Sequence, residues 1–366
     1  MYDTMYGMTR EDCPLTLDSL DDASAGAVLP TRMTAVVQHR YGGPTRLYVA
    51  ETARPMPGPD EVLLAVRAAG VSRGVWHMMT GLPYIVRLVG GLRRPRRATP
   101  GMDVCGDVVQ LGSRVSGFQL GQRVFGIARG SFAEYAVAKA SHLTPAPPEL
   151  TDAQAAVTAE SGLTALQALD AAGITTNTGV GCRVLVVGAA GGVGSFAVQL
   201  AALSGAEVTA VCSGSKAAFT ADLGAARIID YRVTDPLLQG TRYDVILDVA
   251  GGRKLSDLRA SLAPRGTLVF VGNESGAKWT GGFERPFAYQ VRMALRSQRF
   301  VNLLVRTDSA DLARLADLAS RGGLRPRIHA SFPLAGVRDA LEELTSGSTA
   351  GKIALRIDDQ DGDRPS

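Results

Sequence analysis

The feature that most constrains the fold is a glycine-rich turn in the stretch RVLVVGAAGGVGSFAVQLAALSGAEVTAVC, residues 183–212. The pattern predicts a buried strand at Val184–Val187, then the turn, then a helix whose apolar residues recur with a period of 3.6, then a second strand at Val208–Val211. Glycines let a backbone approach a pyrophosphate closely, and the helix N-terminus offers free N–H groups to that anion. Such a turn can also occur without a ligand, but its placement between strand and helix favours dinucleotide binding. The predicted contacts are Gly188, Ala190, Gly191, Gly192, Val193 and Gly194.

The rest of the chain divides into two regions with different sequence patterns. Up to about Leu150 it consists of short β-rich pieces separated by turns, and afterwards strands alternate with helices, which predicts a parallel sheet. In the first part we expect strands at Ala35–His39, Val62–Ala68, Gly106–Val109 and Ala133–Val137. In the second part we expect a helix at Thr151–Ala172, strands at Arg183–Val187, Glu207–Cys212, Arg227–Asp230, Asp244–Asp248, Thr267–Val271 and Phe300–Val305, and a helix at Asp311–Arg321. The end is predicted as strand, helix, strand at Arg327–Phe332, Gly336–Thr345 and Lys352–Ile357.

Composition excludes several classes of protein. Of the 366 residues, 46% are hydrophobic and 20% are charged, so a packed core is expected and global disorder is excluded. The four cysteines form no CxxC pair, which argues against a disulfide framework. The N-terminus is acidic where an export signal needs bases and an apolar core, and the uncharged run at 184–203 is interrupted by glycines. We therefore expect a cytoplasmic protein with no membrane segment.

Charge is unevenly distributed along the chain. The net charge is +4, but residues 1–32 carry −4 and residues 358–366 carry −3, which leaves +11 on the stretch between them. This balance suits an anionic small ligand. One loop is dense in arginine, and it could guide an acidic substrate or cofactor phosphates, or simply be a solvated loop. The sequence does not support nucleic-acid binding, because no recognition motif or interleaved aromatic residues accompany these basic residues. The arginines are Arg87, Arg93, Arg94, Arg96 and Arg97.

The residues after the second strand of the glycine-turn unit indicate which dinucleotide it would bind. NAD sites of this type carry an acid there for the ribose hydroxyls. Here no acid occurs until Asp222, and Ser213 and Lys216 stand in its place, with Tyr231 following the third strand. Hydroxyl and ammonium donors suit a 2′-phosphate. We therefore expect NADPH (NADP+ when oxidised), although Lys216 could also be a solvated helix residue.

Several motifs together resemble one family. They include PGMDVCGDVVQLGSRVSGFQLGQRVFG, GSFAEYAVAK, GLTALQAL, VLVVGAAGGVGSFAVQLA, DVILDVAGG, LAPRGTLVFVGNESG and AGKIAL, which lie between residues 33 and 357. The chain is similar to the medium-chain dehydrogenase/reductase superfamily, in its zinc-independent quinone oxidoreductase-like or alcohol dehydrogenase branch. The resemblance implies an α/β fold with a GroES-like β-rich catalytic domain and a Rossmann doubly wound parallel-sheet cofactor domain. The expected limits are an acidic extension (1–32), the catalytic domain (33–154), the NADP-binding domain (155–322), a return to the catalytic domain (323–357) and a tail (358–366).

The resemblance also bears on metal binding. Zinc-bearing relatives carry a Cys after the Gly-Val of the first-domain motif, a His-Glu pair after the next Pro-Gly, and a third ligand further on. This chain has Ser72, Met102-Asp103 and Glu160 at those places. Zinc prefers Cys and His, and the four-cysteine loop of a structural zinc is also missing. We therefore expect no metal.

The resemblance suggests residues for the chemistry as well. Ser72 would lie near the nicotinamide, where quinone-reductase relatives often have Asn, or it could bond only to its own backbone. Thr164 is a further candidate, and Glu160 could serve as an acid at the bottom of the cleft or stabilise the start of its helix. Cofactor-contacting regions of the family match Gly272, Asn273 and Lys352. Four further residues are expected at the substrate pocket, with Asp103 there or in a structural role: Trp76, His77, Tyr84 and Asp103.

These inferences lead to one expected function and two alternatives. We expect an NADPH-dependent, zinc-free oxidoreductase that transfers hydride to a quinone, an activated C=C bond or a related carbonyl compound. The acceptor could also be a biosynthetic intermediate of one of these kinds. A C=C or quinone acceptor is favoured because carbonyl reduction usually relies on a Lewis acid. The alternatives are an alcohol dehydrogenase or ketone reductase of the same superfamily, and a non-catalytic NADPH-binding protein similar to zeta-crystallin. Relatives pair through the edge strand, so a homodimer is expected through Phe300–Val305.

Overall fold

A computed structural model of the chain describes residues 29–175, 178–272 and 297–357. The chain divides into two units, residues 1–31 and the part from Arg32 onward. Every element below belongs to the second unit. The expected extension (1–32), the tail (358–366) and Asn273 lie wholly or largely outside the described residues.

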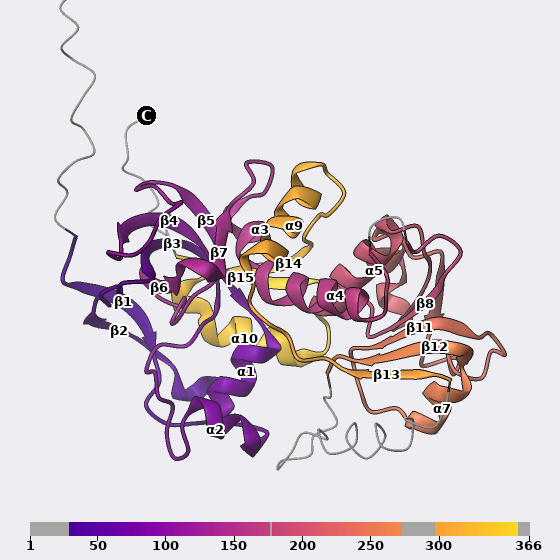
Figure 1. Cartoon of the computed structure of the whole chain (residues 1–366). Coiled ribbons are helices and arrows are strands. Elements are labelled where there is room, and N and C mark those ends of the chain that lie inside the picture. Colours follow the sequence, from indigo (N-terminus) through magenta and orange to yellow (C-terminus); the bar gives the residue numbers. More distant parts are fainter. Residues whose placement is uncertain (1–28, 176–177, 273–296, 358–366) are drawn as a thin grey trace, which may run out of the picture. The chain divides into compact units, whose positions relative to one another are not determined.

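The β-rich half forms a seven-stranded sheet and a small hairpin-like sheet (Figure 1). Strand β3 organises the larger sheet because it pairs antiparallel with β4, β6 and β15 along its eleven residues. The path of this sheet is β14-β15-β3-β4-β5-β7, and β1 pairs with β2 separately. The strands are β1 (Arg32–Val37), β2 (Tyr48–Ala53), β3 (Glu61–Val71), β4 (Asp103–Leu111), β5 (Arg123–Ile127), β6 (Tyr135–Lys139), β7 (Leu143–Pro145), β14 (Ile328–Pro333) and β15 (Lys352–Arg356).

The second half forms a six-stranded sheet in which every pairing is parallel. Its order is β10-β9-β8-β11-β12-β13, so the chain starts in the middle, runs to one edge, and then crosses back to fill the other side. This is the 3-2-1-4-5-6 order of a doubly wound fold, with its switch point between β8 and β11. The strands are β8 (Arg183–Val187), β9 (Glu207–Cys212), β10 (Arg227–Asp230), β11 (Tyr243–Asp248), β12 (Leu262–Phe270) and β13 (Arg299–Asn302). The predicted Rossmann-like α/β class is confirmed.

Helices cover both faces of the parallel sheet because its strands are apolar on both sides. Along β8, Val184 and Val186 pack with the α4 and α5 side, whereas Leu185 and Val187 pack in the cluster that contains Leu258 of α7. Figure 1 shows α4 and α5 above the sheet and α7 below it. The helices are α1 (Arg73–Thr80), α2 (Arg87–Gly90), α3 (Asp152–Ala156), α4 (Ala159–Ala171), α5 (Gly192–Leu203), α6 (Ala217–Asp222), α7 (Leu255–Ala260), α9 (Ser309–Ser320) and α10 (Val337–Ser346). None of the described helices is long and apolar enough to cross a membrane.

The single helix predicted at Thr151–Ala172 is two helices in the structure. Thr151 and Gln154 form a capping box that starts α3, and the backbone leaves helical geometry at Val157 before α4 begins. The break turns α4 so that its buried residues pack on α5 and α9. Sequence periodicity could not show this because Ala-rich residues on both sides of the break continue the apolar pattern.

The chain returns to the first sheet after α9. Strands β14 and β15 belong to the seven-stranded sheet, and β15 pairs antiparallel with β3. The loop before β15 therefore lies beside the glycine turn, where Gly351 N donates a hydrogen bond to Ala190 O at 2.8 Å. We propose that the β-rich catalytic domain spans residues 33–154, that the dinucleotide-binding domain spans residues 155–322, and that the chain returns to the catalytic domain at residues 323–357.

The glycine turn itself is built on two close approaches. Gly188 has a φ of +85°, a conformation that side chains rarely adopt. A Cβ atom on Gly194 would lie 2.1 Å from Gly188 O, so α5 packs directly against the end of β8. A Cβ atom on Gly191 would meet only Gly188 O, at 3.5 Å, which is an ordinary contact.

These two glycines form a matched pair for a stability test. We expect Gly194→Ala to lower the free energy of unfolding by about 1–3 kcal/mol, since the added methyl forces α5 away from β8. Gly191→Ala is the control, and its effect should stay within about 0.5 kcal/mol. Urea unfolding followed by fluorescence measures both. Equal losses from the two variants would contradict this account of the turn.

Candidate functional site

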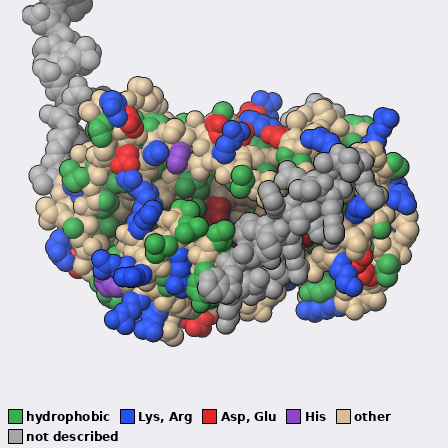
Figure 2. Space-filling view, turned by 60° about the horizontal axis from the view of Figure 1, so that its bottom comes forward, with side chains coloured by type: hydrophobic (Ala, Val, Ile, Leu, Met, Phe, Trp, Pro, Cys, Tyr) green, Lys and Arg blue, Asp and Glu red, His purple; other side chains and the backbone are tan. Residues whose placement is uncertain are grey.

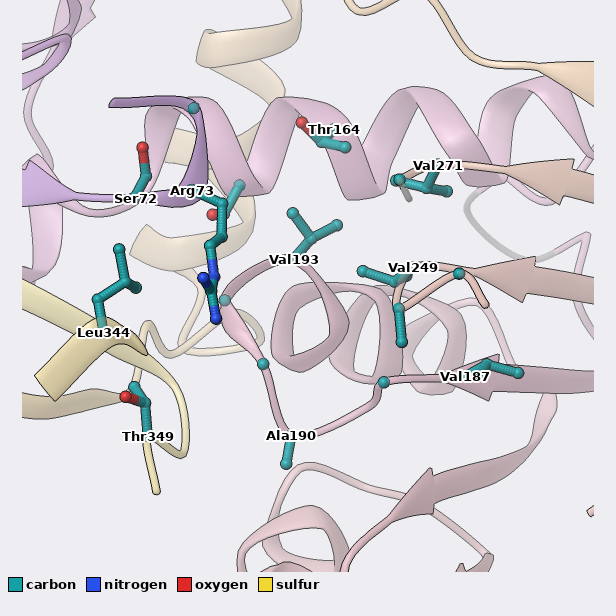
Figure 3. A pocket seen from close by; sticks show the side chains of 18 of the residues that line it. Ser72, Arg73, Thr164, Val187, Ala190, Val193, Val249, Val271, Leu344 and Thr349 are labelled. Atoms are coloured by element: carbon teal, nitrogen blue, oxygen red, sulfur yellow. The ribbon is translucent and has the colours of Figure 1, made fainter. Parts of the chain in front are cut away.

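A cavity of about 930 Å³ lies at the carboxyl ends of the parallel strands (Figure 3). Its lining comes from the residues that follow β8, β9, β11 and β12, and from the β-rich region at Ser72 and at Gly347–Ile353. Ligands of doubly wound sheets bind at this edge, beside the switch point. Most of the predicted cofactor contacts line it: Gly188, Ala190, Gly191, Gly192, Val193, Ser213, Lys216, Tyr231, Gly272 and Lys352.

The glycine turn fits the diphosphate of a dinucleotide. The N-terminus of α5, a twelve-residue helix, faces the cavity through Gly192 and Val193. A Cβ atom on Gly191 would meet only Gly188 O, at an ordinary contact distance of 3.5 Å, so the side of Gly191 that faces the cavity leaves room for a ligand. Gly194 does not line the cavity, because its role is the close packing of α5 on β8. That corrects the prediction that it contacts the cofactor.

The residues after β9 form a polar end of the cavity without a carboxylate. Ser213 is buried and its hydroxyl lies 3.2 Å from that of Ser215. The Lys216 ammonium donates to the carbonyl oxygens of Gly347 at 2.7 Å and Thr349 at 2.8 Å. Burial lowers the pKa of Lys216 from its usual value. Lys216 is therefore no freely solvated side chain, and it links the dinucleotide region to the loop before β15.

The lining of the cavity is cationic. Among the described residues Glu160 is the only acid in it, whereas Arg73, Lys216, Arg253 and Lys352 are basic. In Figure 3 the Arg73 side chain extends from the start of α1 toward the glycine turn. Sequence reasoning missed Arg73 and Arg253. Arg73 directly follows the predicted Ser72, and this position in the sequence could have identified it as a lining residue. Nothing in the sequence marked Arg253, which pairs with Asp235 at 3.0 Å.

A buried charged cluster lies at the inner wall of the cavity. The Lys352 ammonium is 2.9 Å from Ser161 Oγ and 3.5 Å from Asp103 Oδ2. Asp103 Oδ1 accepts a hydrogen bond from the Glu160 backbone N–H at 2.8 Å. Burial raises the pKa of Asp103 to about 7, against the opposing effect of Lys352. The cluster thus fixes the start of α4 to β4 and β15.

This arrangement does not suit a zinc ion. The described residues contain no group of three His, Cys, Asp or Glu side chains placed to hold a metal. Ser72 Oγ accepts a hydrogen bond from Val75 N and caps α1, and Asp103 is already paired with the Lys352 cation. The positive charge next to Asp103 is therefore supplied by the protein itself.

Three predicted catalytic residues meet at the cavity: Ser72, Glu160 and Thr164. The Thr164 hydroxyl donates to Glu160 O at 2.6 Å, which leaves its oxygen free to accept a hydrogen bond from a ligand. Glu160 lies in the first turn of α4, and its Oε2 is buried without a hydrogen-bond partner in the described part of the chain. Figure 2 shows an acidic side chain at the bottom of a hollow with apolar side chains around its rim.

Of the four residues expected at the substrate pocket, only His77 lines this cavity. Asp103 is fully buried behind the wall, and Trp76 packs against the core around Val75 and Met79. Tyr84 lies beside the Arg87 guanidinium instead, with 4.7 Å between that carbon and the ring centroid. Helix α1 turns only one side toward the cavity, so adjacent residues diverge.

Family models match both halves of the chain. Residues 58–148 match a model described as an alcohol dehydrogenase GroES-like domain. Residues 223–355 match a model described as a zinc-binding dehydrogenase. The first range lies in the β-rich half, and the second spans the later part of the parallel sheet and the return to the first sheet.

Relatives cover nearly the whole chain. It is 30% identical to a chloroplast envelope quinone oxidoreductase homologue of Arabidopsis thaliana and 32% identical to a chloroplastic quinone-oxidoreductase homologue of Spinacia oleracea; each match covers 88% of this chain and 98% of the relative. Among solved structures, a quinone oxidoreductase from Coxiella burnetii matches with a TM-score of 0.76 and 28% identity, over 89% of this chain and 99% of that one. A mycobacterial protein in complex with NADPH matches with a TM-score of 0.74 and 27% identity, over 89% and 100%. The chain is therefore an oxidoreductase that belongs to the medium-chain dehydrogenase/reductase superfamily.

Proposed function

We propose that this protein uses NADPH to reduce a quinone or an activated C=C bond without a metal ion. The observation that carries the proposal is the cavity at the switch point, with its glycine turn at one wall and its carboxylate-free polar end. Ser213 and Lys216 at that end favour a 2′-phosphate over bare ribose hydroxyls. The solved neighbour that contains NADPH supports the same choice.

Each part of the cavity has a separate task in this proposal. The turn at Gly188–Gly192 and the N-terminus of α5 bind the diphosphate, while Thr164 offers an acceptor oxygen to the nicotinamide end. When bound, NADPH supplies a hydride from C4 of its nicotinamide. Apolar residues such as Val193, Val249 and Val271 surround this region and limit the access of water (Figure 3).

The acceptor still needs a proton after hydride addition. Glu160 carries a buried oxygen without a partner at the cavity wall, and we assign it to hold that proton. The Ser72 hydroxyl, which keeps its hydrogen while its oxygen caps α1, is the second donor. Reduction of a simple ketone usually relies on a Lewis acid that polarises the carbonyl, and neither of these proton donors is one. A conjugated alkene or a quinone delocalises the added electrons itself and therefore fits the site better.

Two alternatives lead to different observations. An alcohol dehydrogenase or ketone reductase would require a proton relay from Ser72 or Glu160 to the substrate oxygen. A non-catalytic NADPH-binding protein would bind the dinucleotide tightly without turnover on any acceptor. The homodimer through β13 and the cytoplasmic location stay predictions, to be checked by light scattering and by fractionation.

A screen of acceptors tests the proposal directly. We expect NADPH oxidation with quinones, enones or enals, and much slower oxidation with simple ketones. Prior treatment with a chelator should leave the rate unchanged, because the donor set does not suit zinc. Fast reduction of ketones that a chelator abolishes would refute the proposal, and tight binding with no turnover would favour the non-catalytic alternative.

Two variants test the cofactor assignment. Lys216→Ala should weaken NADPH binding at least about tenfold more than NADH binding, since an ion pair with the 2′-phosphate is lost only with NADPH. Gly191→Val is the contrast: its side chain would fill the diphosphate region and weaken both dinucleotides alike. Fluorescence titration measures all four affinities. A Lys216→Ala effect of equal size on both would show that Lys216 only holds the loop at Gly347.

A third variant tests the proton donor. Glu160→Gln keeps the size of the side chain but removes the acid, so kcat should fall by about 100-fold while NADPH affinity is retained. Glu149→Gln, at an exposed site away from the cavity, serves as the control. An unchanged kcat in Glu160→Gln would assign protonation to Ser72 or to water.

A further inference from the structure

A second hollow, of about 610 Å³, lies beside the cavity and is lined almost entirely by basic side chains. We call Arg40, Arg87, Arg93 and Arg94 the arginine patch; His39 and Tyr41 complete the lining. Three of these arginines, Arg87, Arg93 and Arg94, belong to the arginine-dense loop noted in the sequence, and Arg40 comes from a distant position. Figure 2 shows basic side chains gathered at the lower left of the face that it displays.

The arginine patch has no balancing negative charge in the part of the chain that the structure describes. No described carboxylate forms an ion pair with any of its four guanidinium groups, although ion pairs are common elsewhere on the surface. Like charges held together without a counter-ion destabilise the surface that carries them. A bound anion would relieve this repulsion.

One member of the patch is held rigidly. Arg87 Nε donates to Gly81 O at 3.0 Å, and the guanidinium carbon lies 4.7 Å from the ring centroids of both Tyr41 and Tyr84. The Tyr41 hydroxyl is itself fixed, because it donates to Gly91 O at 2.5 Å. Among the described residues Arg87 Nη1 and Nη2 have no hydrogen-bond acceptor. A guanidinium that is already ordered loses little entropy when it binds an oxyanion.

The patch adjoins the proposed catalytic cavity. His77, Pro83 and Val86 line the cavity, and Arg87, the residue after Val86, lines the second hollow. Consecutive Cα atoms are about 3.8 Å apart, so a single residue step separates the two linings. The two hollows are thus lined by neighbouring residues, and this proximity is the geometric basis for assigning one extended ligand to both.

We propose that the acceptor is a phosphate-bearing molecule whose activated C=C bond lies in the cavity and whose phosphate groups lie on the arginine patch. Guanidinium groups pair with phosphate through two parallel hydrogen bonds, which makes a cluster of arginines a phosphate site. An α,β-unsaturated acyl thioester of a nucleotide carrier, such as coenzyme A, has this layout, with a neutral arm between the alkene and the phosphates. This inference rests on the proposed function.

The reaction balances for such an acceptor. A C–H bond forms at the β-carbon with the hydride that the bound cofactor supplies, the C=C π bond breaks, and the electron pair moves onto the thioester carbonyl. The α-carbon then takes one proton from Glu160 or water. The alkene is reduced by two electrons, and NADPH is oxidised to NADP+.

The test compares two thioesters with the same acyl group. Crotonyl-CoA carries phosphates, and crotonyl-N-acetylcysteamine is neutral. For the unaltered full-length protein we expect kcat/KM to be at least about tenfold higher with crotonyl-CoA. Arg93→Gln/Arg94→Gln should reduce this preference at least about tenfold, and added salt should reduce it as well.

The matched control is Arg265→Glu, which lowers the net charge by two units, as the double substitution does. Arg265 lies near the start of β12, away from both hollows. It should leave the preference unchanged, and NADPH affinity should be equal in all three proteins. Turnover of the neutral thioester or of a quinone without any preference for crotonyl-CoA would overturn the inference and leave the proposed function intact. So would a loss of preference in the control. Absence of turnover with every acceptor would overturn the proposed function itself.

Discussion

The arrangement depends on one close approach, where the turn after β8 meets both the start of α5 and the loop before β15. Gly188 adopts a left-handed conformation, Gly194 lets α5 touch the end of β8, and Gly351 donates a hydrogen bond to Ala190. These contacts place the N-terminus of a helix against a strand of the other sheet. The cavity lies at this junction and is lined by residues that follow or belong to strands of both sheets.

Charge inside the cavity follows from the same junction. Lys352, at the start of β15, reaches across to Ser161 and Asp103, so a cation of the chain stands beside the buried carboxylate. Lys216 reaches in the opposite sense, from the dinucleotide side to Gly347 and Thr349. The two lysines therefore stabilise the contact between the sheets while they add positive charge for an anionic dinucleotide. Neither task excludes the other, because each ammonium has three donors.

The arginine patch extends this positive field beyond the cavity. The turn at Gly81 and the short helices that follow bring Arg87, Arg93 and Arg94 together with Arg40, which is distant from them in sequence. A surface that gathers four guanidinium groups with no carboxylate partner among the described residues resembles a binding site more than a solvated face, where charges of both signs are usually interspersed. The proposed acceptor would connect this surface with the hydride-transfer region.

The local pattern of the sequence was sufficient for the βαβ unit, for the parallel sheet and for the limits of β8, β9 and β10, because period-2 and period-3.6 patterns and glycine positions are local properties. In the β-rich half it missed β2, β5 and β7. The cofactor-side residues were predictable for the same reason, since they follow strands directly. Tertiary structure alone decided that Thr151–Ala172 breaks at Val157, that Trp76 and Tyr84 do not line the cavity, and that Arg73 does. It also decided that Lys216 bonds to carbonyls more than 130 positions away. Such outcomes depend on which distant surfaces pack together, and a local pattern does not contain that information.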